Sequence, residues 1–206
     1  MATRGDPFDR LPRYLAEVGV HASLGQLEQF RAHFDLLVRW NERTNLTSVR
    51  DPEAILRRHF AESAYLTQVV RLGSGTLVDI GSGAGFPGIS VKILSPQTKV
   101  VLVEAVQKKA AFLKEVARAV GLPGLEVFAG RFEDRQDFAA DWITMRAVKL
   151  EAPLVEAIRR NVPRGTYAIF LGESDAARLS GAKIYAIPGS DRRVIAVGTC
   201  STWNIL

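Results

Sequence analysis

The amino-acid sequence predicts an α/β fold in which a doubly wound, mostly parallel sheet follows an N-terminal helical extension. Residues 8–70 carry apolar side chains at helical spacing, whereas from residue 76 onward short apolar runs alternate with amphipathic segments. The first of these runs ends in a glycine-rich turn, residues 79–88 (DIGSGAGFPG). Strands that alternate with helices form parallel sheets covered by helices, so these observations together predict the fold.

Length and composition bound the organisation of the chain. Its 206 residues are enough for one compact unit with a full core. We expect residues 1–72 to form the helical extension and residues 73–206 the sheet-containing core, because the loop at residues 72–75 (LGSG) separates the two patterns. The single cysteine, Cys200, excludes an internal disulfide and a cysteine-based metal site, and we expect no metal.

Net charge and hydropathy indicate whether nucleic acid or a membrane could be a partner. The net charge of +5 arises from 27 basic and 22 acidic residues, which is compatible with a nucleic-acid partner but does not require one. The apolar runs are too short to cross a membrane. The first residues lack the apolar segment of a signal peptide. We therefore expect a cytoplasmic protein with no membrane partner.

The extension is predicted to contain two main helices. Asp51-Pro52 matches an N-cap followed by proline at the first position of the second helix. In both helices apolar side chains recur three or four residues apart, which is typical of an amphipathic helix. These side chains are Leu24, Leu27, Phe30, Phe34, Leu37 and Val38 in the first helix, and Ile55, Leu56, Phe60 and Leu66 in the second.

The strands of the sheet are short apolar runs separated by helices or turns. Only a short turn separates the last two runs, which predicts an antiparallel hairpin at the end of the chain. The predicted strands are residues 76–80, 99–103, 125–129, 142–145, 167–171, 183–187 and 194–197, and the predicted helices among the first of them are residues 87–94 and 107–120.

The turn after the first strand is the predicted binding site. Ligands of such sheets bind at the carboxyl ends of the strands, where this turn lies. Gly81, Gly83 and Gly85 permit a sharp turn and let a ligand approach the backbone closely. Nicotinamide and flavin enzymes use a similar loop, so the glycines alone leave the ligand open.

Glu104, at the end of the second strand, indicates an adenosine ligand. Its carboxylate can accept hydrogen bonds from both ribose hydroxyls, which S-adenosylmethionine and NAD share. Phe86-Pro87 favours the methyl donor, because it crowds the helix start at which a dinucleotide pyrophosphate needs free amides. Little chain remains for a nicotinamide and substrate domain. S-adenosyl-L-methionine is therefore the predicted cofactor, and a dinucleotide oxidoreductase is an alternative.

Longer motifs carry a more specific likeness. They are residues 40–52 (WNERTNLTSVRDP), 58–63 (RHFAES) and 78–89 (VDIGSGAGFPGI), together with Lys108-Lys109 and Phe112-Leu113. These motifs resemble the bacterial small-subunit (16S) ribosomal RNA guanine-N7 methyltransferase family, RsmG, also called glucose-inhibited division protein B. The resemblance covers roughly residues 15–200 and implies a class I (Rossmann-like) S-adenosylmethionine-dependent methyltransferase fold.

The resemblance also implies an activity and its partners. The expected reaction is methylation of a guanine N7 in 16S ribosomal RNA, in the 530 loop. The expected partner is that RNA, either alone, in the 30S subunit or in an assembly intermediate, and the expected enzyme is a monomer. The alternatives are a methyltransferase of another RNA, a protein or a small molecule, and an RNA- or cofactor-binding relative that has lost catalysis.

Cofactor-binding roles can be carried over position by position. By resemblance Gly81, Gly83 and Phe86 line the cofactor, Glu104 holds its ribose, and Phe132 with Glu133 borders the adenine.

The resemblance further implies basic residues around the reaction. Arg146, at the end of the fourth strand, faces the reaction centre as the catalytic residue and borders the cofactor. Arg131 and Arg192 match RNA-binding positions, with Arg193 an equal candidate to Arg192. Met145 departs from the pattern, because the family usually has serine there.

The chemistry of guanine N7 is consistent with these residues. N7 carries an exposed lone pair and no proton, so its methylation needs no general base. The enzyme must instead align N7 with the methyl group. An arginine can bind O6 or a phosphate, or stack on the base, and thereby leave N7 free. A base in a folded RNA loop would have to be splayed out.

Overall fold

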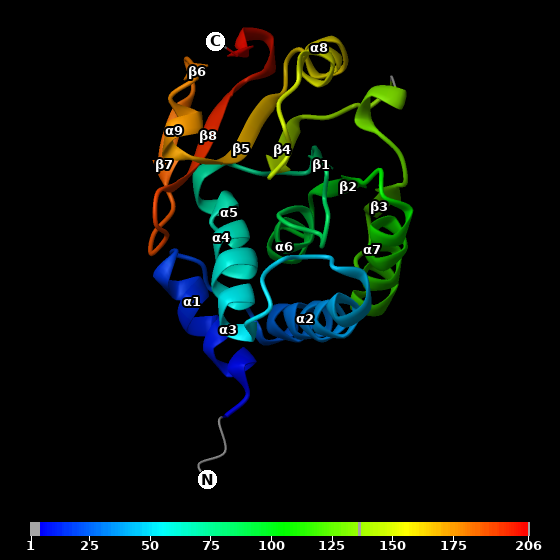
Figure 1. Ribbon diagram of the computed structural model, residues 1–206, viewed down its shortest axis with the longest axis vertical. Helices are drawn as coiled ribbons and strands as arrows, with labels where there is room; N and C mark the ends of the chain where they lie inside the picture. The colour runs from blue at the N-terminus through cyan, green and yellow to red at the C-terminus, as the bar shows by residue number, and fades with distance from the viewer. Residues whose placement is uncertain (1–4, 136, 206) are drawn as a thin grey trace.

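A seven-stranded sheet runs through the computed structural model and separates its helices into two layers (Figure 1). The structure describes residues 5–135 and 137–205. The strands of this sheet are β1 (Thr76–Ile80), β2 (Lys99–Val103), β3 (Leu125–Phe128), β4 (Trp142–Arg146), β5 (Thr166–Gly172), β7 (Lys183–Ala186) and β8 (Arg193–Thr199). Two short strands, β6 (Leu179–Ser180) and β9 (Asn204–Ile205), pair separately.

The strand order, β3-β2-β1-β4-β5-β8-β7, is that of a doubly wound sheet. Neighbouring strands from β3 through β5 are parallel, whereas β8 is antiparallel to β5 and β7 is antiparallel to β8. The predicted parallel sheet and its terminal hairpin are confirmed. The chain proceeds outward from β1 through β2 to β3 and then returns to β4, so the order reverses between β1 and β4. Ligands of open α/β sheets bind at such a reversal.

Helices cover both faces of the sheet (Figure 1). Those of the extension share one face with α6 and α7, whereas α8 packs on the opposite face. The helical elements are η1 (Pro7–Arg10), α1 (Leu11–Glu17), α2 (Leu24–Thr44), α3 (Pro52–Ile55), η2 (Leu56–Ala61), α4 (Glu62–Ala64), α5 (Leu66–Val69), α6 (Gly88–Leu94), α7 (Gln107–Val120), η3 (Phe132–Asp134), α8 (Ala152–Asn161), α9 (Glu173–Ala176) and η4 (Cys200–Thr202).

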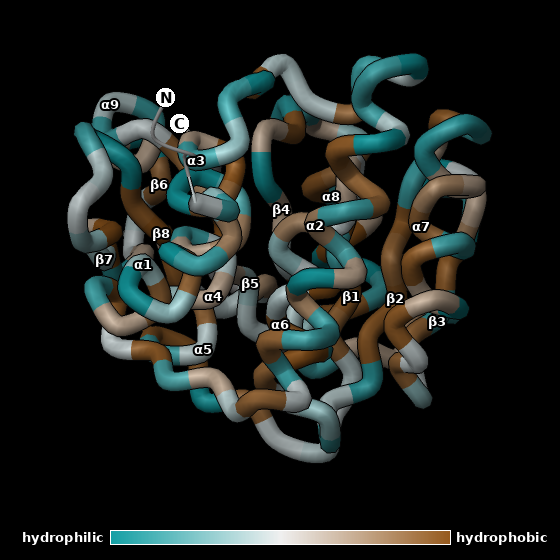
Figure 2. The backbone as a smooth tube through the Cα atoms, turned by 90° about the horizontal axis from the view of Figure 1, so that it is seen from below, coloured by the Kyte–Doolittle hydropathy of each residue, from teal (hydrophilic) through white to brown (hydrophobic). Residues whose placement is uncertain are grey.

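Side chains of the strands alternate between the two layers, as the pleat of a strand requires. On β1, Leu77 packs with the extension, whereas Val78 and Ile80 pack in the layer of α8. Figure 2 shows β1 and β2 as mainly hydrophobic, while the tube of α2 alternates between hydrophilic and hydrophobic residues. The buried residues of α2, including Phe30, belong to the same core cluster as Leu77. The extension and the sheet therefore share a hydrophobic core.

The long helix α2 begins where its sequence provides a cap. The Ser23 hydroxyl accepts from the Gln26 amide at 3.3 Å, and the Gln26 side chain accepts from the Ser23 amide at 2.9 Å. Gln26 also donates to the carbonyl of Ile93 in α6 at 2.9 Å. Leu24 was expected on the apolar face, but it precedes this contact as the first residue of the helix and is 82% exposed.

The second part of the extension is one helical run with an irregular centre. Asp51 caps it by accepting from the Ala54 amide at 2.7 Å, as predicted. Residues 56–61 form a π-helical stretch, and the α-helix resumes at Glu62. π-Helical stretches often occur at functional sites because they redirect the side chains that follow. Here the stretch precedes a carboxylate on the buried side of the helix.

Gly88, the first residue of α6, lies where the helix passes closest to the sheet. Its amide donates to Oδ2 of Asp79 at 3.0 Å. A Cβ atom at this position would lie 2.4 Å from Cδ2 of Leu102 and 2.7 Å from Oδ2 of Asp79. Both neighbours are fully buried, so neither can move away easily. Gly88, the last glycine of the predicted turn, is therefore needed for close packing of helix on strand.

Replacing Gly88 with alanine should lower the free energy of unfolding by about 1–3 kcal/mol, as overpacking of a filled core does. The matched control is Gly25→Ala in the first turn of α2, where a Cβ would meet nothing within 4 Å, so no loss is expected. Chemical denaturation of both variants measures the difference. Equal stability of the two variants would contradict the close packing at Gly88.

Candidate active site

The glycine loop joins β1 to α6 across the end of β2. The amides of Gly81 and Ser82 donate to the carbonyl of Val103 at 2.8 and 3.1 Å. Gly81 has a φ of +70°, and a Cβ there would lie 2.5 Å from Cγ2 of Val148. Only glycine combines this backbone conformation with so close an approach. The segment after β4 therefore closes directly over the loop.

A cavity of about 300 Å³ opens beside this loop. Gly81, Glu104, Arg131, Phe132 and Glu133, which the sequence places far apart, all line it. The other lining residues are Ile80, Val103, Ala105, Gly130, Val148, Lys149, Glu151 and Leu154. We call this space the loop cavity. It lies at the carboxyl ends of β1 and β2, next to the reversal of strand order.

Glu104 ties the glycine loop to the end of β2. Its Oε2 accepts from the Gly83 amide and its Oε1 from the Val106 amide, each at 2.8 Å. The side chain is buried yet borders the cavity. Each carboxylate oxygen has two lone pairs, so both can still accept a hydroxyl of a bound ribose. These amide bonds set the orientation of the carboxylate in advance.

Phe86 and Gly83 do not line the loop cavity. Gly83 acts there through its bond to Glu104. The Phe86 ring points into the extension, where it stacks on His33 and His59 with centroids 4.9 and 5.2 Å apart. Its predicted contact with a cofactor stays a prediction. What the structure shows is that Phe86 anchors the loop to the helical layer.

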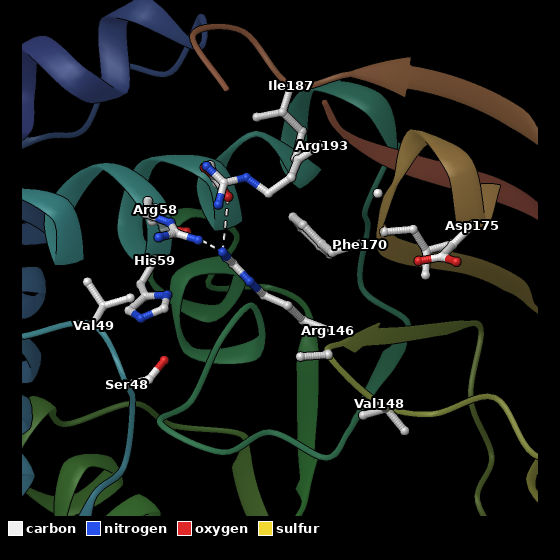
Figure 3. A pocket seen from close by; sticks show the side chains of 14 residues that line it. Ser48, Val49, Arg58, His59, Arg146, Val148, Phe170, Asp175, Ile187 and Arg193 are labelled. Carbon is white, nitrogen blue, oxygen red and sulfur yellow. Dashed lines mark hydrogen bonds and ion pairs between the residues drawn. The ribbon is translucent and has the colours of Figure 1, made fainter. Parts of the chain in front are cut away.

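A second cavity, of about 420 Å³, adjoins the first, and Val148 lines both. We call it the arginine cavity, because Arg58, Arg146 and Arg193 line it (Figure 3). Its other lining residues are Ser48, Val49, His59, Glu62, Ala147, Phe170, Leu171, Gly172, Asp175 and Ile187. Residues of the extension and of the sheet thus form it together.

Arg146 enters the arginine cavity from the end of β4. Its guanidinium lies 5.5 Å from the centroid of the Phe170 ring on the neighbouring strand. Met145 points to the opposite face, where it is fully buried in the layer of α8. The departure from the family pattern at Met145 therefore lies on the far side of the sheet from Arg146.

The other predicted arginines separate in space. Arg131 lines the loop cavity and not the arginine cavity. Arg193 lines the arginine cavity, whereas Arg192 is exposed, has a φ of +52° and lines neither. The alternation of β8 explains this, because Arg193 has the same parity as Ile195, which packs in the layer of the extension. Of the two candidates left open by the sequence, Arg193 faces the site.

Two site residues were not assigned by sequence reasoning. Glu62 is 5% exposed and pairs with both Arg146 and Arg193. Burial raises the pKa of its carboxyl, against the opposing effect of the two guanidiniums. His59 borders the arginine cavity and hydrogen-bonds to the Thr47 hydroxyl at 2.7 Å. The only sequence signal for either residue was its place within the motif at residues 58–63.

Three buried titratable side chains lie near the loop: His33, His59 and Asp79. The two histidines are weak bases, and Asp79 has a structural role. Burial lowers the pKa of His59 to about 3 and that of His33 to about 4, so both imidazoles are neutral at neutral pH. Burial raises the pKa of Asp79 to about 7, and its Oδ2 is occupied by the Gly88 amide. The cationic character of the arginine cavity therefore comes from its arginines.

Within residues 5–135 and 137–205, no cluster of three or more His, Cys, Asp or Glu residues could hold a metal ion. No helix in these ranges has the length and apolarity needed to span a membrane.

The amino-acid sequence is similar to those of known ribosomal RNA methyltransferases. The sequence profile described as rRNA small subunit methyltransferase G (GidB) matches residues 26–187. A protein of Lachnoclostridium phytofermentans named "Ribosomal RNA small subunit methyltransferase G" is 37% identical over 75% of this chain and 66% of its own length. One of the same name from a Geobacter species is 38% identical over 84% of this chain and 81% of its own.

A solved structure supports the fold. The crystal structure of a SAM dependent methyltransferase from Aquifex aeolicus superposes with a TM-score of 0.59 and 17% identity over 75% of this chain and 97% of its own. At that identity the likeness concerns the fold, and it agrees with the sheet order described above. The chain belongs to the rRNA small subunit methyltransferase G family and has the class I fold of S-adenosylmethionine-dependent methyltransferases.

Proposed function

We propose that this protein transfers a methyl group from S-adenosyl-L-methionine to N7 of a guanine in 16S ribosomal RNA, in the 530 loop. The observation that supports it most is the pair of cavities that adjoin at Val148. One cavity holds a carboxylate suited to a ribose, and the other holds arginines beside Phe170. A donor in the first and a base in the second would meet at their common wall.

The loop cavity has the groups that S-adenosylmethionine requires. Glu104 would accept its ribose hydroxyls, Phe132 and Glu133 would border its adenine, and Gly81 would permit close approach of the loop. When bound, the cofactor supplies an electrophilic methyl group on a sulfonium. The relatives named as ribosomal RNA small subunit methyltransferases support ribosomal RNA as the acceptor.

The arginine cavity suits a guanine that reacts at N7. Arg146 and Arg193 can donate to O6 or to a phosphate while leaving the N7 lone pair free. Phe170 can contact the face of the base. His59 is neutral and weakly basic, and the Glu62 carboxylate is engaged in ion pairs. A reaction without proton removal needs neither as a base, so positioning by the arginines is what the site contributes.

We further propose the form of the substrate, the oligomeric state of the enzyme and the compartment in which it acts. The substrate is 16S RNA, alone, in the 30S subunit or in an assembly intermediate, and the enzyme acts as a monomer in the cytoplasm. Arg131, exposed beside the loop cavity, would contact the RNA around the target base. The chain's net charge of +5 is compatible with this partner.

The direct test compares ribosomal RNA from cells with and without this gene by mass spectrometry of nuclease fragments. We expect 7-methylguanosine to disappear from one position of the 530 loop and to return on complementation. Unchanged 16S RNA would overturn the proposal in favour of another acceptor. Cofactor binding by the purified protein, without transfer to any ribosomal RNA, would indicate a relative that has lost catalysis.

Arg146→Ala should keep its affinity for S-adenosylmethionine and lose methyl transfer by about 100- to 1,000-fold, as loss of a group that acts in the transition state does. Calorimetry and a tritiated-methyl assay measure the two effects. The control is Arg160→Ala, an exposed arginine on α8 across the sheet, which should leave both unchanged. Loss of cofactor binding in folded Arg146→Ala would refute its assignment to the substrate side.

Glu104→Ala should have the converse effect and weaken cofactor binding first. Loss of hydrogen bonds to a charged acceptor costs about 1.5–3 kcal/mol, or roughly a 10- to 100-fold rise in Kd. Calorimetry with S-adenosylhomocysteine measures it, with Glu126→Ala, an exposed glutamate of β3, as the control. If both variants bind like the wild type, Glu104 does not hold the ribose.

A further inference from the structure

Glu62 lies at the centre of the arginine cavity's wall, between three separate parts of the chain. It is the first residue of α4, immediately after the π-helical stretch. Its side chain is 6% exposed, and its two oxygens serve different arginines. Oε2 accepts from Nη2 of Arg146 at 3.0 Å, and Oε1 forms an ion pair with Nη2 of Arg193 at 2.5 Å. The carboxylate therefore links the extension to β4 and β8.

Besides Glu62, the two arginines donate hydrogen bonds to nearby hydroxyl and carbonyl groups of the chain. Arg146 donates from Nη1 to the Ser63 hydroxyl at 3.2 Å and from Nη2 to the carbonyl of Arg58. Arg193 donates from Nε to the Ser190 hydroxyl at 3.0 Å. A guanidinium has five N–H donors in a rigid plane. Among residues 5–135 and 137–205, hydrogen bonds to Glu62, Ser63 and Arg58 use three donors of Arg146, and its other N–H groups can meet a ligand. Arg193 likewise has N–H groups besides those that contact Ser190 and Glu62.

Stability alone does not explain the buried cluster of Glu62 with two arginines, because burying charges is unfavourable. Burial of a carboxylate costs several kcal/mol before pairing, and a buried ion pair is weak evidence for net stabilisation. Its best-attested use is to specify one geometry. Here one carboxylate sets the orientation of two guanidiniums that line the same cavity.

We propose that Glu62 is a positioning residue for methyl transfer, which holds Arg146 and Arg193 so that their unused N–H groups meet the target base or its phosphate. This inference rests on the proposed function. In this role Glu62 acts through the two arginines and not as a base on either reactant. Loss of the carboxylate would leave the guanidiniums to repel each other and turn away from the productive geometry.

The charge balance of the reaction gives Glu62 a second effect. Attack by N7 forms the nitrogen–carbon bond, breaks the sulfur–carbon bond and transfers the positive charge from sulfonium to base. The methylated guanine is then cationic beside Arg58, Arg146 and Arg193. Glu62 and Asp175 are the carboxylates among the lining residues, and Glu62 forms ion pairs with Arg146 and Arg193. Its negative charge offsets the repulsion that develops during transfer.

Glu62→Gln tests the proposal, since it keeps the shape and removes the charge. We expect folded protein, unchanged affinity for S-adenosylhomocysteine, and kcat and kcat/KM lowered together by about 100-fold, the effect of misplaced catalytic groups. Glu62→Asp keeps the charge and should recover part of kcat. The matched control is Glu17→Gln, which removes a carboxylate paired with Arg57 at 3.4 Å outside the cavity and should leave kcat unchanged. Wild-type kcat in both Glu62 variants would overturn the proposal, as would a loss of cofactor affinity equal to the loss of kcat.

Nuclear magnetic resonance of ¹⁵N-labelled arginine side chains tests positioning independently of activity. In the wild type we expect separate, slowly rotating Nη signals for Arg146 and Arg193, and in Glu62→Gln we expect averaged signals. Freely rotating guanidiniums in the wild type would overturn the positioning role whatever the activity. Hindered guanidiniums in a wild-type protein that methylates no ribosomal RNA would support the geometry and overturn the proposed function alone.

Discussion

The requirement that a buried charge be compensated organises the active-site region. Glu62 can be buried only because Arg146 and Arg193 reach it from β4 and β8. That requirement brings the helical extension to the carboxyl edge of the sheet and encloses the arginine cavity between them. Both parts are needed to form the wall of the cavity, since Ser48, Arg58 and His59 come from the extension and Phe170 comes from the sheet. The extension is therefore part of the site itself.

The loop cavity depends on backbone hydrogen bonds and close packing. Glu104 fixes the loop through the amide of Gly83 and is itself held by the amide of Val106, and Phe86 fixes the loop to the helices through His33 and His59. His59 in turn borders the arginine cavity. One aromatic stack thus connects the loop that would hold the donor with the wall that would hold the acceptor. Rigid elements on both sides suit a reaction whose main need is alignment.

Much of the fold could be predicted because it depends on local periodicity. The seven strands of the main sheet and helices α6 and α7 agree closely with the predicted ranges, since alternation and helical spacing are properties of short segments. The short pair β6 and β9 was not predicted, because two-residue strands carry no periodic signal. Leu24 was misplaced for a related reason: periodicity identifies a face of a helix but not where its contact with a neighbour begins.

Local sequence patterns were enough to predict the class of fold, the glycine loop and the acidic strand end at Glu104, because each depends on neighbouring residues and their backbone. It also carried the motifs of the family. Only the tertiary structure decided that Arg193 faces the cavity and Arg192 does not, that Phe86 points into the helices, and that Glu62 joins two arginines. These depend on strand parity and on contacts between residues more than 80 positions apart in sequence, and no local pattern records such contacts.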